Sequence, residues 1–143
     1  MRLVQQSLPL LALTMGDPAG IGPEVIVRAL QDTTVFDKCR PFVIGAVGAI
    51  RLASTLVGSN LIVQSVDDFQ NAGRRPGQID VLELPGVDVT GVVSRRLSAQ
   101  AGNAAVTWAR KGAELAFAGE IAGVVTAPVN KEAVTLVGHA AFD

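Results

Sequence analysis

Residues 14–24 constrain the possible fold more than any other stretch of the sequence. This segment reads TMGDPAGIGPE and holds three glycines and two prolines. Proline interrupts helices and central strands, and glycine allows positive φ and a close approach to the backbone. An apolar run at residues 8–13 leads into the segment, and an amphipathic run at residues 25–30 follows it. The sequence therefore predicts a buried strand, a tight loop and a helix, with Pro23 as the first helical residue.

Two interpretations of this loop remain open. It is either a plain strand-to-helix turn or a cradle for an anion or substrate at a helix N-terminus. Its glycine spacing is neither the G-x-G-x-x-G pattern of dinucleotide-binding folds nor the phosphate-binding G-x-x-x-x-G-K-[ST] pattern. Asp17 would also repel a phosphate unless its side chain points away or binds a cation or a hydroxyl group. These features exclude a standard Rossmann site and a standard P-loop.

Apolar and amphipathic segments alternate along the rest of the chain. Strands are expected at residues 41–45, 61–63, 79–84 and 121–126, and helices at residues 48–57, 99–118 and from 129 onward. Ser98 and Asn130 are the expected N-caps of the last two helices. Alternating strands and helices predict an α/β sandwich with a largely parallel sheet. No internal domain boundary is expected within residues 1–143.

Several finer expectations follow from local patterns. Residues 79–84 alternate polar and apolar side chains, which predicts a half-exposed strand in a side layer, whereas residues 121–126 predict a buried strand. Trp108 is expected in the core. Gly20 is expected at a positive φ, so that Gly20→Val would damage folding. The pair Arg95–Arg96 favours solvated surface over a ligand role.

The positions of two loops suggest a shared site. Residues 14–24 follow the first predicted strand, and residues 127–132 follow the last one. Ligands in parallel α/β sheets collect beyond the carboxyl ends of the strands. Asp17 and Lys131 are therefore expected at the same edge of the sheet.

Composition limits the possible partners and compartments. The net charge of −1 gives no indication of a nucleic-acid or anionic-membrane partner. The single cysteine, Cys39, excludes an intrachain disulfide and fits a reducing compartment. Residues 1–13 are too short for a membrane span and lack a convincing cleavage site for a signal peptide. A cytoplasmic location is the resulting expectation.

Three motifs together resemble one enzyme family. They are residues 14–24, the string VTAPVNKEA at residues 125–133, and GHAAF at residues 138–142. Their order and spacing are similar to those of the 4-hydroxythreonine-4-phosphate dehydrogenase family of pyridoxal-phosphate biosynthesis. The chain departs from that pattern at Ala140–Ala141, where the family has Thr-Glu. Members of the family are much longer, so this chain resembles their N-terminal part.

The resemblance implies a fold and an activity. The fold would be a three-layer α/β sandwich like that of isocitrate and isopropylmalate dehydrogenases, here incomplete. The reaction would be the NAD-dependent oxidation, with decarboxylation, of 4-phosphohydroxy-L-threonine in pyridoxal 5'-phosphate (vitamin B6) biosynthesis. The enzyme would be a homodimer with a small phosphorylated hydroxy acid as its substrate.

The resemblance also assigns residues. Asp17, Lys131 and His139 are the expected substrate-binding residues, and no catalytic residue is expected within this chain. The family's divalent metal (Zn, Mg or Co) is held by histidines beyond the matched region, as are most residues that hold NAD. His139 is the sole histidine, and one histidine cannot build a three-histidine metal site. The 143-residue chain alone is therefore expected to be inactive.

Two other functions remain open. The protein is alternatively a related dehydrogenase acting on another four-carbon sugar-acid phosphate, or a truncated, non-catalytic remnant that binds a partner or a ligand. A chain that stops at Asp143 is expected to leave sheet edges and apolar helix faces uncovered, and therefore to self-associate or to need a missing half.

Overall fold

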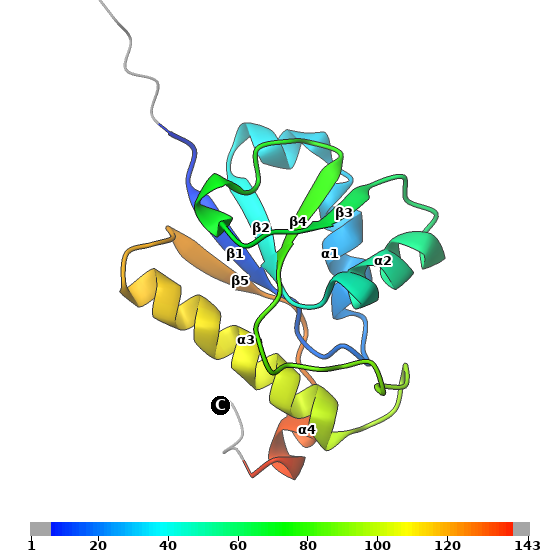
Figure 1. Ribbon diagram of the computed structural model, residues 1–143. Coiled ribbons are helices and arrows are strands. Elements are labelled where there is room, and N and C mark those ends of the chain that lie inside the picture. The colour runs from blue at the N-terminus through cyan, green and yellow to red at the C-terminus, as the bar shows by residue number, and fades with distance from the viewer. Residues whose placement is uncertain (1–6, 139–143) are drawn as a thin grey trace, which may run out of the picture.

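Five parallel strands form one sheet in the computed structural model, which describes residues 7–138 (Figure 1). The strand order across the sheet is β3-β4-β2-β1-β5, and every neighbouring pair is parallel. The strands are β1 (Leu10–Thr14), β2 (Arg40–Ile44), β3 (Ile62–Ser65), β4 (Gln78–Leu82) and β5 (Gly123–Thr126). The predicted α/β fold with a parallel sheet is confirmed.

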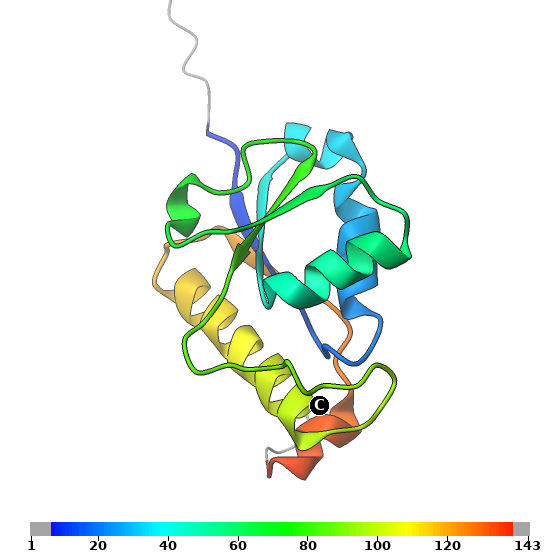
Figure 2. The ribbon, with the colours of Figure 1, turned by 45° about the vertical axis from the view of Figure 1, so that its right-hand side comes forward.

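The helices cover the sheet on both faces. They are α1 (Gly22–Leu30), α2 (Val47–Leu56), α3 (Ala99–Phe117) and α4 (Lys131–Leu136), with two 3-10 turns, η1 (Thr33–Asp37) and η2 (Phe69–Asn71). The chain moves from β1 through β2 to β3 in one direction along the sheet, and from β4 to β5 in the other. Because crossovers between parallel strands are right-handed, the helices of the two directions must lie on opposite faces. Figures 1 and 2 show this arrangement, with α1 and α2 on one side and α3 on the other.

Local signals in the sequence explain where the helices begin. Pro23 lies in the first turn of α1, where its missing N–H costs no hydrogen bond. The Ser98 side chain accepts a hydrogen bond from the Ala101 N–H at 3.1 Å, which caps α3. The Asn130 side chain accepts one from the Glu132 N–H at 3.0 Å, which caps α4. Both predicted N-caps are confirmed.

The core lies between the sheet and its helices. Residues Arg40–Ile44 of β2 are buried at every position, as a strand covered on both faces requires. Trp108 of α3 is only 1% exposed, so its predicted place in the core is confirmed. Other fully buried side chains come from β1, β2, α2 and β4; they include Ala12, Phe42, Ile44, Ile50 and Val81.

The predicted side layer for residues 79–84 is wrong. β4 lies inside the sheet, between β3 and β2, and Ile79 and Val81 are buried. The polar residue that suggested exposure, Asp80, is buried as well. Its carboxylate accepts hydrogen bonds from the Gly73 N–H at 2.9 Å and from Gln78 Nε2 at 2.6 Å. A buried carboxylate with such partners produces the same alternation as a half-exposed strand.

The predicted burial of residues 121–126 is also wrong for the strand itself. Ile121 is buried, but β5 is an edge strand of the sheet and Val125 is 52% exposed. Within residues 7–138, one side of β5 has no pairing strand.

No helix in the described part of the chain is long and apolar enough to cross a membrane.

Candidate functional site

The sheet has a topological switch point between β1 and β5. These two strands are neighbours and run parallel. The chain leaves β1 toward α1, on one face of the sheet, and leaves β5 toward α4, which packs on α3 at the other face. Two loops that diverge to opposite faces leave a crevice at the carboxyl ends of their strands, and ligands of α/β proteins bind in such crevices.

Backbone hydrogen bonds join the two loops at this point. The Ala127 N–H donates to the Thr14 carbonyl oxygen, and the Asp17 N–H donates to the Pro128 carbonyl oxygen, both at 3.0 Å. Gly16 lies between these bonds with φ 72°. A Cβ at Gly16 would overlap the Pro128 carbonyl oxygen and lie 2.8 Å from that of Ala127. Glycine is therefore required at this position, both for its backbone conformation and for the close approach of the loops.

Gly20 differs from Gly16. It is not among the residues with positive φ, and a Cβ there would meet its nearest neighbour, the Asp17 carbonyl oxygen, at 3.5 Å. The prediction of a positive φ at Gly20 is wrong. The conformational constraint lies four residues earlier, at the exit of β1, where the two loops touch.

Asp17 is 4% exposed and organises the turn. Its Oδ1 accepts a hydrogen bond from the Ala19 N–H at 2.8 Å, and its carbonyl oxygen accepts one from the Gly20 N–H at 3.0 Å. The carboxylate is thus fixed in place by the loop that carries it. A structural role in the turn is apparent from these contacts, and the role in substrate binding stays a prediction.

A pocket of about 370 Å³ opens beside Asp17 at the switch point. This volume lies within the range of about 300–1,000 Å³ that is typical of small-molecule sites. Its lining comes from three segments: the loop after β1 and the start of α1, the loop after β5, and the segment before α3. Those segments contribute residues Asp17, Ala19, Gly20, Ile21 and Glu24; Pro128, Val129 and Asn130; and Ser94, Arg95, Arg96 and Leu97.

The arginine pair is the part of this pocket that sequence reasoning missed. Arg95 and Arg96 are exposed, as predicted, but they also line the pocket. The Arg95 N–H donates a hydrogen bond to the Ala19 carbonyl oxygen at 2.7 Å, which holds this segment against the loop after β1. That contact joins positions far apart in the chain, so no local pattern in the sequence could have indicated it.

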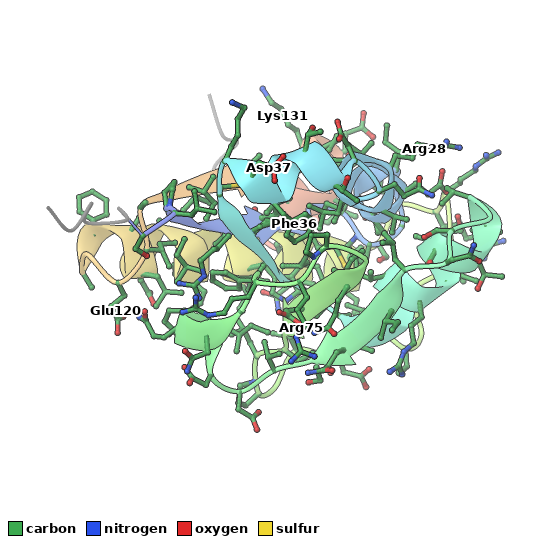
Figure 3. The ribbon with its side chains drawn as sticks, turned by 90° about the horizontal axis from the view of Figure 1, so that it is seen from above. Arg28, Phe36, Asp37, Arg75, Glu120 and Lys131 are labelled. Atoms are coloured by element: carbon green, nitrogen blue, oxygen red, sulfur yellow. The ribbon has the colours of Figure 1, made fainter. Side chains whose placement is uncertain are left out.

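Lys131 does not line this pocket. Lys131 is the first residue of α4 and follows Asn130, but its side chain is exposed and is not part of the pocket lining. Figure 3 shows it extending outward from the ribbon. His139 lies outside the described residues. The loop with Asp17 and the start of α4 do share one edge of the sheet, and substrate binding by Lys131 and His139 stays a prediction.

The residues that the structure describes cannot by themselves form the divalent-metal site that the resemblance implies. Within residues 7–138 there is no group of three or more His, Cys, Asp or Glu side chains that could hold a metal ion. For NAD, the loop after β1 lacks the dinucleotide fingerprint and carries the buried carboxylate of Asp17. The positively charged guanidinium groups of Arg95 and Arg96 do complement the negative charge of a phosphoryl group.

Comparisons with known proteins agree with the fold and the motifs. The family model described as "Pyridoxal phosphate biosynthetic protein PdxA" matches residues 37–143. A 4-hydroxythreonine-4-phosphate dehydrogenase of Desulfosudis oleivorans is 38% identical over 92% of this chain and 39% of its own length. A D-threonate 4-phosphate dehydrogenase of Cupriavidus necator is 41% identical over 92% of this chain and 39% of its own length.

A solved structure of a protein with the same name as the first of these relatives has a similar fold. The crystal structure of a 4-hydroxythreonine-4-phosphate dehydrogenase from Burkholderia phymatum superimposes with a TM-score of 0.87 at 38% identity, over 94% of this chain and 40% of that one. The described chain is therefore an incomplete α/β sandwich of the dehydrogenase type, and it spans about 40% of the length of the relatives it matches. From the extent of the family match, over residues 37–143, this chain belongs to the PdxA family of pyridoxal phosphate biosynthetic proteins.

Proposed function

We propose that this chain is the N-terminal part of an NAD- and divalent-metal-dependent dehydrogenase that oxidises and decarboxylates 4-phosphohydroxy-L-threonine in pyridoxal 5'-phosphate biosynthesis. The observation that carries the proposal is the identity of 38% to a relative named 4-hydroxythreonine-4-phosphate dehydrogenase, over 92% of this chain. The metal ligands and most of the NAD site would come from residues outside this chain. We propose that the working enzyme is a homodimer.

The residues of this chain would form one wall of the active site. The crevice between the loops after β1 and β5 would receive the substrate, and Asp17 would accept a hydrogen bond from a substrate hydroxyl or amino group. Lys131 and His139 would approach from the loop and helix after β5. Because the loops are joined through the Asp17–Pro128 hydrogen bond, this wall would be rigid before the substrate binds.

A second substrate is favoured by one observation. The Cupriavidus necator relative, which is 41% identical, is named for D-threonate 4-phosphate. This acid has a hydroxyl group where 4-phosphohydroxythreonine has an amino group, and both are phosphorylated four-carbon hydroxy acids. A non-catalytic remnant is the remaining alternative.

A chimeric enzyme tests the proposal. Residues 1–143 would replace the matching N-terminal part of the Burkholderia phymatum protein, and NADH formation would be measured with each of the two phosphorylated acids and a divalent metal. The intact relative is the positive control, and the 143-residue chain alone, which is expected to be inactive, is the negative control. Turnover of either acid supports a dehydrogenase, and the preferred acid identifies the substrate. A folded, dimeric chimera that turns over neither acid would contradict the proposal and favour the remnant.

A further inference from the structure

The pocket at the switch point has two walls of opposite charge. Arg95 and Arg96 line it on the segment before α3, and Asp17 and Glu24 line it on the loop after β1 and the first turn of α1. Both guanidinium groups belong to exposed residues, whereas Asp17 is only 4% exposed. A ligand in this pocket therefore meets exposed cationic donors on one side and a buried carboxylate, held by its own loop, on the other.

The backbone of Arg95 is held in an unusual conformation. Arg95 has φ 63°, the one positive φ at a non-glycine residue in the described part of the chain. Its N–H donates to the Ala19 carbonyl oxygen at 2.7 Å. Non-glycine residues adopt the left-handed region at a cost, and they persist there where the surroundings hold them, often at binding sites.

The chemistry of the two walls defines a ligand class. Guanidinium groups donate paired hydrogen bonds to phosphate oxygens and keep their charge at every physiological pH. The carboxylates of Asp17 and Glu24 repel an anion, so an anionic group is confined to the arginine side, while hydroxyl or amino donors fit the carboxylate side. This combination matches a ligand with a phosphoryl group at one end and hydroxyl groups along its length.

We propose that Arg95 and Arg96 bind a phosphoryl group of the ligand that occupies this pocket. The choice of ligand rests on the proposed function, which offers two sources of the same chemistry: the phosphate of the hydroxy acid and the diphosphate of NAD. The arginine pair then acts in binding and not in the chemical step.

The experiment measures binding to the 143-residue chain by titration calorimetry, with folding checked by circular dichroism. The probes are inorganic phosphate, 4-phosphohydroxy-L-threonine and NAD, with unphosphorylated 4-hydroxythreonine as a negative control. The test variant is Arg95→Gln/Arg96→Gln. The matched control is Arg74→Gln/Arg75→Gln, a second consecutive pair that precedes β4 and so lies at the amino ends of the strands.

The test variant is expected to weaken binding of a phosphorylated probe by about ten- to a hundredfold, since charged hydrogen bonds are lost, while the control pair has no effect. Weakening with 4-phosphohydroxy-L-threonine identifies the hydroxy acid as the source, and weakening with NAD alone identifies the dinucleotide. Equal affinity in wild type and test variant, equal weakening by the control pair, or no binding of any probe to the wild type would each overturn the proposal.

Arg95→Gly separates a binding role from a structural one. Glycine removes the guanidinium and also relieves the left-handed backbone strain. We expect this variant to bind the phosphorylated probe more weakly while its melting temperature rises. A lower melting temperature with unchanged affinity would assign Arg95 a structural role and contradict the proposal. Because all readouts are binding and stability, an inactive chimera would count against the proposed dehydrogenase without affecting this result.

Discussion

The Asp17 N–H donates a 3.0 Å hydrogen bond to the Pro128 carbonyl oxygen, and this contact joins the loop after β1 to the loop after β5. The two residues lie far apart in the chain, but β1 and β5 are neighbours in the sheet. The contact therefore brings two motifs of the sequence to one place, at the edge of the pocket.

Gly16→Ala is expected to destabilise the protein strongly. The substitution places a side chain at φ 72° and against the Pro128 and Ala127 carbonyl oxygens. Left-handed strain alone costs about 1–3 kcal/mol, and the steric overlap adds to it. Gly20→Ala is the matched control, since a Cβ there lies 3.5 Å from its nearest neighbour. Urea unfolding measures both variants, and equal free energies of unfolding would contradict this account of the loop.

Gly102→Ala is expected to loosen the contact between α3 and α4. A Cβ at Gly102 would overlap the Ala133 carbonyl group and lie 2.8 Å from the Val134 nitrogen. Alanine is more favourable than glycine inside a helix by about 1 kcal/mol. A net loss of stability in Gly102→Ala would therefore show that the steric overlap with α4 outweighs the gain in helix propensity. Gly48→Ala in α2 is the control, because no atom lies within 4 Å of its Cβ position. A Gly102→Ala protein as stable as Gly48→Ala would show that the helices can move apart freely.

Cys39 is expected to react slowly in the folded protein. The residue is buried, its Sγ donates to the Val35 carbonyl oxygen at 3.5 Å, and burial raises the pKa of the thiol above its ordinary value of 9.0. A thiol-specific reagent at pH 8 should therefore modify it much more slowly than it modifies the urea-unfolded chain. Because the Cys39 thiol ionises at a lower pH in the unfolded chain than in the folded protein, its contribution to the free energy of unfolding decreases as the pH rises above 9.0. Equal reaction rates in the two states would place Cys39 at the surface.

The isolated chain is expected to self-associate through β5 and the end of α3. Val125 is 52% exposed on an edge strand, and Phe117 is 96% exposed. Exposed strand edges and apolar side chains pair readily with other chains. Sedimentation velocity should show species larger than a monomer, and Val125→Lys should reduce them. A monodisperse monomer at all concentrations would contradict the prediction.

The sequence predicted most of the fold because its local signals agreed with its apolar pattern. The buried run at β2, the N-caps at Ser98 and Asn130, and the proline at the start of α1 are local features. The prediction that residues 79–84 form a half-exposed strand in a side layer fails because Asp80 is buried, with a hydrogen-bond partner, Gly73, in the loop before β4. The prediction that β5 is buried fails because the exposure of a strand depends on its place in the strand order of the sheet, which an apolar run does not specify.

The site was predictable only in part for the same reason. Loops at the ends of parallel strands share one edge, so the approach of residues 14–24 to residues 127–130 followed from the topology. The contribution of Arg95 and Arg96 depends on how the segment before α3 lies against the loop after β1, where the Arg95 N–H donates to the Ala19 carbonyl oxygen, and no spacing rule encodes that contact. The direction of the Lys131 side chain likewise follows from its position on the surface of α4.

A crystal structure of the chimeric enzyme with 4-phosphohydroxy-L-threonine and a divalent metal tests the central claim most directly. The bound acid is expected in the crevice between the loops after β1 and β5, within hydrogen-bond distance of Asp17, with Lys131 and His139 on the same side of the sheet. An acid bound elsewhere, or Asp17, Lys131 and His139 on opposite sides of the sheet, would contradict it.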